Sequence, residues 1–265
     1  MLRRYYLELL LILSAVLLIG QLAWPTVTRW WWRPLPGSIG IDQFDSVGVE
    51  LNQEFLVYLP PGYGSGAWPL VVYLHGAGER GTDPNELRSW GPFAAVQNGL
   101  HIPGIVIGPQ CRPDSGWSPD SIMQLVEHAA SRYNVNRDRI YVVGFSMGAY
   151  GTWQTAASNP DVFAAIVPIC GGGSLENAKA LAKVPTWAFH GDKDNVVPLV
   201  ESQSMVEAML AAGGQPKMTV IPEAGHGIVN DVCCRLELWN WLFQQRRDQR
   251  QSLQQGTEPS VTPDS

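Results

Sequence analysis

The chain has 265 residues, of which 45% are hydrophobic, and 18 Lys and Arg face 24 Asp and Glu for a net charge of −6. This hydrophobic fraction excludes wholesale disorder, and an acidic pI near 5.3 argues against a nucleic-acid partner. Four cysteines are too few for a disulfide scaffold, and the length suits one enzyme-sized domain of roughly 200–250 residues.

The N-terminal segment predicts a membrane anchor. Residues 9–28 contain no charged side chain, two arginines lie on each side of this run, and Tyr and Trp residues lie at its ends. Aromatic residues of this kind favour the membrane–water interface. As a helix, the 18 residues from Leu7 to Trp24 span roughly 27 Å, close to the ~30 Å hydrocarbon core of a bilayer. We therefore expect residues 1–24 to cross a lipid bilayer once, with the body of the protein outside the cytoplasm.

A cleaved signal peptide is the alternative interpretation of residues 1–24, and it would make the protein secreted. Cleavage after Ala23 would place Gln21 where signal peptidase requires a small side chain, so the anchor is favoured. A buried core helix is disfavoured because the run has no polar face. The flanking arginines are equal in number and do not fix the orientation.

Composition divides the rest of the chain into three parts. Residues 25–38 are rich in Trp, Pro and Gly and are expected to form a linker. Residues 247–265 have almost no apolar side chains to bury and are expected to form a disordered polar tail. Residues 39–246 remain as the globular domain, and their 12 Lys and Arg against 20 Asp and Glu make it more acidic than the whole chain.

Apolar runs alternate with helix-like stretches along this domain. The expected strands are Ser46–Glu50, Glu54–Leu59, Leu70–Leu74, Ile105–Ile107, Ile140–Gly144, Ala164–Ile169, Thr186–Phe189 and Lys217–Ile221. The expected helices are Asn85–Asn98, Pro119–Tyr133, Met147–Asn159, Ser174–Lys183, Leu199–Ala212 and Ile228–Gln245. Continuous apolar runs indicate strands buried on both faces of a parallel sheet. We predict an α/β fold with a mostly parallel eight-stranded sheet, helices on both faces, and a ligand site beyond the carboxyl ends of the strands.

The segment after the fifth expected strand predicts a nucleophile. Its sequence is G-F-S-M-G over residues 144–148, and a helix-like stretch follows directly. This strand–turn–helix context is the one that a G-x-S-x-G nucleophile elbow requires, and it presents Ser146 at the top of the sheet. Side chains at positions 144 and 148 would collide in so tight a turn, which explains the two glycines.

Two later strand ends predict the partners of Ser146. Asp192 and Asp194 follow the seventh expected strand, and either carboxylate could orient an imidazole. His226 follows the eighth expected strand in a glycine-flanked loop and is the expected general base. The order Ser, Asp, His along the chain differs from the orders in chymotrypsin and subtilisin.

A glycine-rich loop follows the third expected strand. Acyl transfer needs two preorganised donors at the tetrahedral oxyanion, and the expected donors are the backbone N–H groups of Met147 and of Ala77 in this loop. His75 is expected to brace the loop without transferring a proton. Glu79 and Arg80 are expected to form either an ion pair that braces the loop or a contact with substrate, with the ion pair favoured.

Five segments together resemble the α/β-hydrolase superfamily: Y-L-P-P-G-Y at 58–63, Y-L-H-G-A-G-E-R-G at 73–81, V-G-F-S-M-G-A-Y-G-T-W at 143–153, H-G-D-K-D-N-V-V-P at 190–198 and A-G-H at 224–226. They are most similar to small serine esterases of the phospholipase/carboxylesterase and polyhydroxybutyrate-depolymerase/feruloyl-esterase type, including dienelactone-hydrolase-like proteins. The resemblance implies that Asp194 is the catalytic acid, through the pattern H-G-x-x-D-x-x-V-P. Dienelactone hydrolases proper carry Cys as the nucleophile, where this chain has Ser146.

The spacing of the later strands predicts an open site. Only a short segment separates the sixth and seventh expected strands, and its 14 residues Cys170–Lys183 have room for one helix and no inserted cap domain. This favours short or exposed acyl groups. The four cysteines lack the C-x-x-C spacing of a zinc site, so we expect neither a metal nor an organic cofactor. Cys111 could pair with a C-terminal cysteine in an oxidising compartment.

Taken together, these residues predict a membrane-anchored carboxylesterase-type serine hydrolase with a small-molecule ester substrate. Ser146, His226 and Asp194 would form the triad, and the reaction would pass through an acyl-enzyme intermediate. A serine peptidase or a thioesterase of the same fold is the alternative enzyme. A non-catalytic, membrane-tethered binding module on a hydrolase scaffold is the alternative from another class, and the complete triad argues against it.

Overall fold

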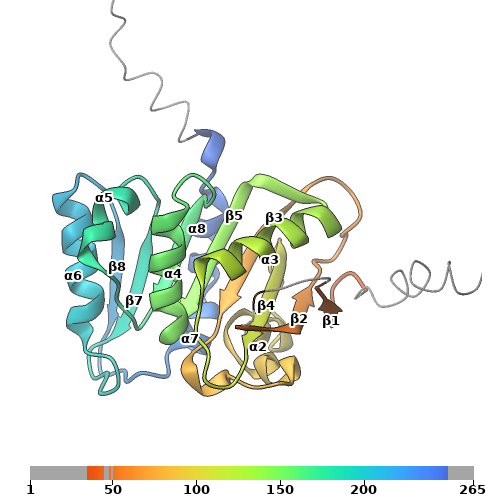
Figure 1. Cartoon of the computed structure of the whole chain (residues 1–265), viewed down its shortest axis with the longest axis horizontal. Coiled ribbons are helices and arrows are strands. Elements are labelled where there is room, and N and C mark those ends of the chain that lie inside the picture. Colours follow the sequence, from red (N-terminus) through yellow and green to blue (C-terminus); the bar gives the residue numbers. More distant parts are fainter. Residues whose placement is uncertain (1–34, 45–47, 49, 250–265) are drawn as a thin grey trace, which may run out of the picture.

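The middle layer of the protein is an eight-stranded sheet (Figure 1). The computed structural model describes residues 35–44, 48 and 50–249. The strands are β1 (Ile39–Gln43), β2 (Leu51–Tyr58), β3 (Trp68–Leu74), β4 (Ile105–Cys111), β5 (Val135–Phe145), β6 (Ala165–Ile169), β7 (Trp187–Gly191) and β8 (Lys217–Ile221). Their order across the sheet is β1-β2-β4-β3-β5-β6-β7-β8. β2 runs antiparallel to both of its neighbours and every other pair is parallel, which confirms the mostly parallel sheet.

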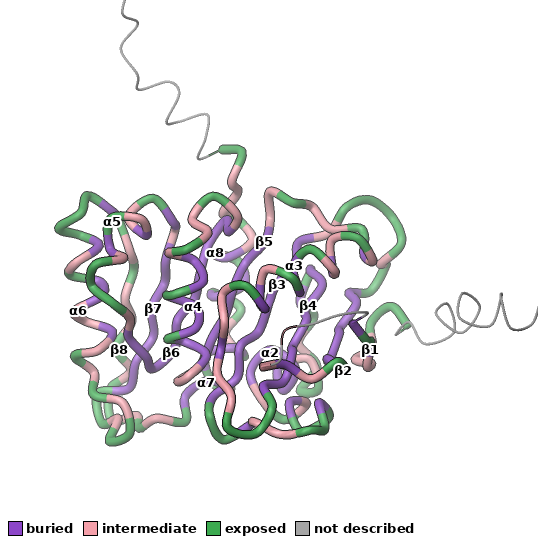
Figure 2. The backbone as a smooth tube through the Cα atoms, viewed as in Figure 1, coloured by how far each residue is buried: buried purple, intermediate pink, exposed green. Residues whose placement is uncertain are grey.

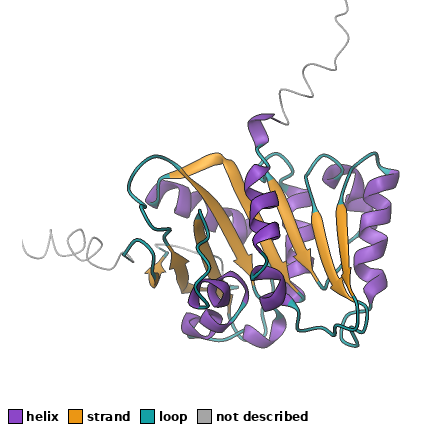
Figure 3. Cartoon of the chain, turned by 180° about the vertical axis from the view of Figure 1, so that it is seen from behind, coloured by secondary structure: helices purple, strands orange, loops and turns teal. Residues whose placement is uncertain are grey.

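Helices cover both faces of this sheet (Figures 1 and 3). One face carries α3 (Pro119–Arg132), α4 (Met147–Ser158), α5 (Ala178–Leu181) and α6 (Leu199–Ala211). The other face carries η2 (Pro84–Ser89), α2 (Gly91–Gln97), α7 (Val229–Cys233) and α8 (Leu236–Gln244). Two short 3₁₀ turns, η1 (Ala77–Glu79) and η3 (Leu175–Asn177), lie in the connections after β3 and β6.

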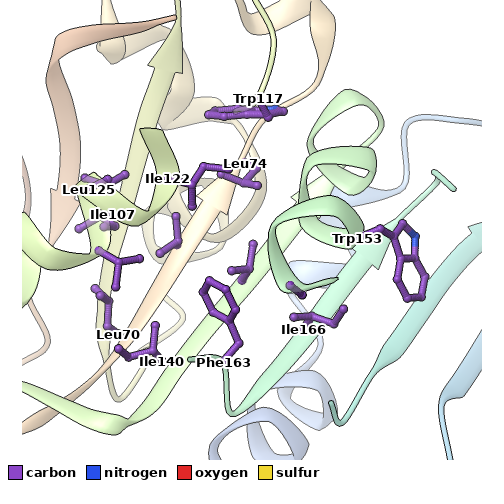
Figure 4. Close-up of a cluster of buried hydrophobic side chains, with 14 of the residues drawn as sticks. Leu70, Leu74, Ile107, Trp117, Ile122, Leu125, Ile140, Trp153, Phe163 and Ile166 are labelled. Atoms are coloured by element: carbon purple, nitrogen blue, oxygen red, sulfur yellow. The ribbon is translucent and has the colours of Figure 1, made fainter. Parts of the chain in front are cut away.

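The central strands consist mostly of buried residues (Figure 2), because their alternate side chains fill two separate clusters, one on each face of the sheet. On β3, Leu70 and Leu74 pack toward α3 and α4, in the cluster drawn in Figure 4. Val71 and Tyr73 of the same strand pack in the cluster on the opposite face, which also holds side chains of α2 and α8. Burying a side chain of this size contributes roughly 1.5–3 kcal/mol to folding. The continuous apolar runs of the sequence therefore correspond to strands covered on both faces, as predicted.

The first strand differs from the prediction. The expected strand Ser46–Glu50 is wrong where the structure describes it, because Gly48 belongs to no regular element and Glu50 lies in a turn. Glu50 accepts a hydrogen bond from the Ser121 hydroxyl at 2.7 Å, which ties this segment to α3. The true first strand is β1, and its carboxylate Asp42 is buried. A five-residue edge strand with a buried charge lacks the apolar alternation that identifies strands in a sequence.

Two expected helices are broken in the structure. The stretch Asn85–Asn98 forms η2 and α2, because Trp90 is extended and Pro92 has no N–H to continue a helix through that point. The stretch Ile228–Gln245 forms α7 and α8, because Arg235 is extended. The Trp239 indole N–H then donates to the carbonyl of Cys233, at the end of α7, at 2.8 Å.

The connection between β6 and β7 is short, as expected. It contains only η3 and α5 between Ile169 and Trp187, with no inserted domain. Cys111, Cys170, Cys233 and Cys234 are all free thiols, so the pairing of Cys111 considered from the sequence is not formed.

The expected anchor over residues 1–24 lies outside the described residues, as do most of the expected linker and tail. Within residues 35–44, 48 and 50–249, no helix combines the length and the apolar character needed to cross a bilayer.

Candidate active site

Ser146 stands at the turn between β5 and α4, where the backbone is held in a strained conformation. Its φ is +53° and its ψ is −117°, backbone angles that residues other than glycine rarely adopt. The Ser146 N–H donates to the carbonyl of Ile169 on β6 at 2.8 Å, which fixes the turn against the neighbouring strand. A Cβ at Gly144 would come within 2.1 Å of the Gly148 carbonyl oxygen, and one at Gly148 within 1.9 Å of the Leu74 carbonyl oxygen. The turn therefore requires both glycines, as predicted.

His226 lies between Ser146 and Asp194. The His226 Nε2 atom is 2.9 Å from Ser146 Oγ, and the Nδ1 atom is 2.7 Å from Asp194 Oδ2. A carboxylate can only accept, so Nδ1 carries the proton and Nε2 is free to accept one from the serine hydroxyl. The His226 side chain is 17% exposed and the Asp194 side chain 0%. Phe145 packs beside the imidazole, with ring centroids 4.9 Å apart.

Asp194 is surrounded by hydrogen-bond donors. Its Oδ1 atom accepts from the N–H groups of Val196 and Val197, each at 2.9 Å. Burial alone would raise the pKa of this carboxyl, but the hydrogen bonds from His226, Val197 and Val196 outweigh burial and hold the pKa below its ordinary value. The side chain is therefore an ionised acceptor. Asp192, the other aspartate considered from the sequence, is exposed.

Backbone contacts hold the loop after β7 against the loop after β8. The Asp192 N–H donates to the carbonyl of Ile221 at 3.1 Å, and the Lys193 N–H donates to the carbonyl of Ala224 at 2.9 Å. These two bonds lie directly beside the residues that carry the aspartate and the histidine. The Asp194–His226 distance is thus set by backbone pairing rather than by the two side chains alone.

The two expected oxyanion donors lie on neighbouring elements. Met147 is the first residue of α4, and Ala77 begins η1 after β3, which pairs with β5 in parallel register. Among the described residues neither N–H has a hydrogen-bond partner within the chain, so both are available to an anion. The start of a helix favours negative charge for the same reason. This geometry is compatible with the roles predicted for Ala77 and Met147.

His75 braces the loop that carries Ala77. Its Nδ1–H donates to the carbonyl of Gly76 at 2.5 Å, and its Nε2 accepts from the Cys111 N–H at 2.9 Å. Burial lowers the pKa of His75 to about 4, so the ring is neutral near pH 7. The Trp117 indole N–H donates to the His75 carbonyl at 3.1 Å. His75 is a structural residue of this loop, as the sequence suggested.

Glu79 and Arg80 do not form the favoured ion pair in the part of the chain that the structure describes. Glu79 is buried, and its Oε2 atom lies 2.9 Å from the position that a Cβ on Gly76 would take. Burial raises the pKa of this carboxyl. The Glu79 carbonyl accepts from the Gln110 side-chain amide at 3.0 Å. Glu79 is therefore an inward-facing residue of the loop that carries Ala77. The sequence does not reveal this burial, because the segment is charged and rich in glycine.

Among the described residues, one group of possible metal ligands includes Asp194. The donor atoms of Cys170, His190 and Asp194 all lie within 4.8 Å of one another. Both nitrogens of His190 already have hydrogen-bond partners in the chain, and so do both oxygens of Asp194. We therefore treat this group as a hydrogen-bonded network. The sequence motif H-G-D-K-D-N-V-V-P contains His190 without indicating a role for it, although a histidine directly after the seventh expected strand lies at the edge of the sheet where the site is expected.

Residues 117–233, which include the serine, aspartate and histidine of this site, match the Dienelactone hydrolase family model. A Salmonella typhimurium protein with the name "Putative carboxymethylenebutenolidase" is 29% identical over 218 residues, which cover 73% of this chain and 79% of that protein. Poly(3-hydroxyalkanoate) depolymerase C of Paucimonas lemoignei is 29% identical over 133 residues, which cover 46% of this chain and 32% of the relative.

Solved structures give the same fold. A thermostable esterase superposes with a TM-score of 0.69 at 31% identity, over 79% of this chain and 63% of the esterase, so this chain spans less than two thirds of that protein. A feruloyl esterase module from Clostridium thermocellum, at 19% identity, shares the fold with a TM-score of 0.61 over 81% of this chain and 92% of the module. Residues 117–233 of this chain are therefore similar to the Dienelactone hydrolase family, and the relatives of the chain include esterases, in agreement with the resemblance to the α/β-hydrolase superfamily.

Proposed function

We propose that this protein is a serine carboxylic-ester hydrolase, in the EC 3.1.1 class, that works through an acyl-enzyme intermediate. The observation that carries the proposal is the position of the His226 imidazole, 2.9 Å from Ser146 Oγ and 2.7 Å from Asp194 Oδ2. A hydroxyl, an imidazole and an ionised carboxylate in this order can generate a nucleophile at neutral pH.

In the acylation half-reaction, Ser146 Oγ forms a bond to the carbonyl carbon of the ester. His226 Nε2 takes the hydroxyl proton and returns it to the leaving alkoxide as the C–O bond breaks. Asp194 stabilises the imidazolium that exists between these two transfers. The N–H groups of Ala77 and Met147 bind the oxyanion of the tetrahedral intermediate.

In the deacylation half-reaction, a water molecule takes the place of the departed alcohol. His226 removes its proton while the water oxygen bonds to the acyl carbon, and the same proton then returns to Ser146 Oγ as the acid leaves. Because every proton passes through the one imidazole, the cycle requires neither a metal nor an organic cofactor.

Two observations support carboxylic esters as the substrates. The relatives include proteins named as an esterase and as a poly(3-hydroxyalkanoate) depolymerase, and both names denote ester cleavage. The connection between β6 and β7 carries only η3 and α5, which favours short or exposed acyl groups because no inserted domain encloses the site from that side.

The proposal is tested with the full chain and a panel of chromogenic substrates. We expect steady turnover of p-nitrophenyl acetate, much slower cleavage of an aminoacyl p-nitroanilide, and stoichiometric labelling by a fluorophosphonate. Ser146→Ala should abolish both turnover and labelling. The matched control is Ser174→Ala, an exposed serine whose hydroxyl caps no helix, and it should keep both.

Each alternative has its own outcome in this panel. Faster cleavage of the anilide would identify a peptidase, and preference for an acyl thioester over the matched oxygen ester would identify a thioesterase. Absence of turnover on every substrate, together with absence of fluorophosphonate labelling of a folded protein, would overturn the enzyme proposal in favour of a binding module.

A further inference from the structure

We propose that His190 is a positioning residue of the reaction: its buried imidazole fixes the Asp194 carboxylate and the loop around it, so that Asp194 can orient His226. This inference rests on the proposed serine hydrolase activity. It assigns a function to the buried histidine beside Asp194, separate from the proton transfer assigned to His226.

The surroundings of His190 determine where its proton lies. The residue is on β7 and its side chain is 0% exposed. The His190 Nε2 atom lies 2.9 Å from the carbonyl oxygen of Val197 and 3.2 Å from Asp194 Oδ2. Both of these oxygens only accept, so Nε2 must carry a proton. A single buried N–H therefore faces the carboxylate and the backbone of the same loop.

The second ring nitrogen of His190, Nδ1, contacts the helix α6, which packs against the sheet. His190 Nδ1 lies 2.8 Å from the hydroxyl oxygen of Ser202 on α6, and that hydroxyl is also 2.8 Å from the Gly171 carbonyl oxygen. The imidazole thus links β7, α6 and the loop that holds Asp194. A planar ring with both nitrogens engaged and no exposed surface cannot reorient without breaking a buried hydrogen bond.

The contact with His190 adds a second imidazole beside the Asp194 carboxylate. Its Oδ1 atom accepts from Val196 and Val197, whereas its Oδ2 atom accepts from His226 Nδ1 at 2.7 Å and lies 3.2 Å from His190 Nε2. Oδ2 is the atom that must stay in line with His226 Nδ1 while the imidazolium forms. Without His190, the Oδ2 atom would be held only by His226, the residue that Asp194 must orient, and the rest of the support would come from the bonds on Oδ1.

Cys170 lies on the same network and does not replace His190. Burial raises the pKa of its thiol to about 12, so it remains neutral, and a thiol is a weak donor. In the described part of the chain, the ring nitrogens that lie near Asp194 Oδ2 are therefore those of His226 and His190. Among them, His190 is the one that is not used for proton transfer.

The test compares three substitutions at position 190 in the full chain. His190→Gln places an amide N–H close to the position of Nε2, whereas His190→Leu and His190→Asn supply no donor at that position. With p-nitrophenyl acetate we expect the Leu and Asn variants to lose roughly 10- to 100-fold in kcat, because small misplacements of catalytic groups have effects of this size, with KM within about twofold. The Gln variant should recover kcat to within roughly fivefold of the wild type.

A spectroscopic readout separates positioning from general destabilisation. The proton between His226 Nδ1 and Asp194 should give a low-field ¹H resonance, and we expect it to weaken or shift in the Leu and Asn variants and to persist in the Gln variant. The matched control is Phe189→Leu, the adjacent buried residue of β7, whose ring packs in the cluster on the opposite face. It should lower the unfolding temperature without changing kcat or the resonance.

The two failures are distinguishable. If the wild type hydrolyses the ester and the Leu and Asn variants keep full kcat and an unchanged resonance, the role of His190 is overturned and the proposed function stands. If the wild type hydrolyses nothing, the proposed function falls, and the low-field resonance still decides whether His190 holds Asp194. Loss of activity in the Gln variant as complete as in the Leu variant would also contradict the proposal.

Discussion

The Trp117 indole N–H donates a hydrogen bond to the carbonyl oxygen of His75 at 3.1 Å, and the two rings lie 4.8 Å apart. The contact joins the start of α3 to the loop that carries an expected oxyanion donor. His75 also contacts the Gly76 carbonyl within the loop and accepts from the Cys111 N–H on β4, so Trp117 and Cys111 hold the loop after β3 from outside it. The loop that carries Ala77 is therefore braced by the buried side chains of His75 and Trp117.

Trp117→Phe should weaken this support while keeping an aromatic ring under the loop. Loss of one buried hydrogen bond predicts a decrease of about 1 kcal/mol in the free energy of unfolding, measured by urea titration. We also expect kcat on p-nitrophenyl acetate to fall several-fold with little change in KM. Trp187→Phe is the control, because it removes a similar bond, to Thr219 at 2.9 Å, on strands at the other end of the sheet. An equal loss of kcat in both variants would argue against a specific effect on the oxyanion loop.

The negative charge of Asp194 should affect kcat more than the shape of its side chain does. In Asp194→Asn, the amide N–H would face His226 Nδ1 and favour the ring tautomer that cannot accept the serine proton. We expect kcat to fall roughly 10³- to 10⁴-fold, the size of effect known for this change in a serine protease triad. Asp192→Asn, two residues earlier and exposed, should remain within twofold of the wild type. Steady-state kinetics of the two variants would decide between the aspartates.

His75 predicts a pH dependence of stability. Its pKa is about 4 in the folded protein and 6.5 in the unfolded chain, so between these values only the unfolded chain takes up the proton. The free energy of unfolding should therefore fall as the pH decreases from 6.5 toward 4, with a contribution of roughly 3 kcal/mol from this residue.

Urea titrations at pH 7.5 and pH 4.5 test this dependence with His75→Gln, which cannot titrate. The variant should lose less stability than the wild type between the two conditions. His101→Gln, at an exposed histidine, should behave like the wild type. An identical loss of unfolding free energy in His75→Gln and in the wild type would show that groups other than His75 cause the loss of stability between pH 7.5 and pH 4.5.

Glu79 predicts a pH dependence in the other direction. Burial raises the pKa of its carboxyl, so ionisation of Glu79 at neutral pH disfavours the folded state. Glu79→Gln should raise the urea midpoint at pH 7.5, and the advantage should disappear as the pH falls below the ordinary carboxyl range, where Glu79 is protonated in both states. Glu176→Gln, at an exposed glutamate, is the control and should show no such trend. A lower midpoint for Glu79→Gln at pH 7.5 would contradict this account.

Much of the site could be predicted from the sequence because its signals are local. The turn around Ser146 is specified by two glycines within five residues, and steric exclusion at those positions is independent of the rest of the fold. The loops that carry Asp194 and His226 follow apolar strands whose ends coincide closely with those expected. Parallel strands bring such ends to one edge of a sheet, so the juxtaposition follows from topology.

The parts that could not be predicted depend on tertiary contacts. β1 was missed because its short strand buries Asp42 beside Arg132 and Tyr133, which are distant in the sequence. The break before α8 depends on an extended residue, Arg235, with no proline or glycine to mark it. The contact of Asp194 with His190 depends on the path of the loop between them, and no spacing rule gives that path.

Strand register has a consequence for how this protein can be studied during folding. β7 pairs with β8 so that Gly191 stands opposite Ile221, and the loops with Asp194 and His226 begin directly after these residues. A slip of one residue would displace one loop by about 3.3 Å, which is more than a hydrogen bond can absorb. If Ser146 reacts with a fluorophosphonate as proposed, the fraction of labelled protein would report how much of the sheet has reached its native register. Sampled along a refolding time course, it would count only those molecules in which the parallel strands have reached their native alignment.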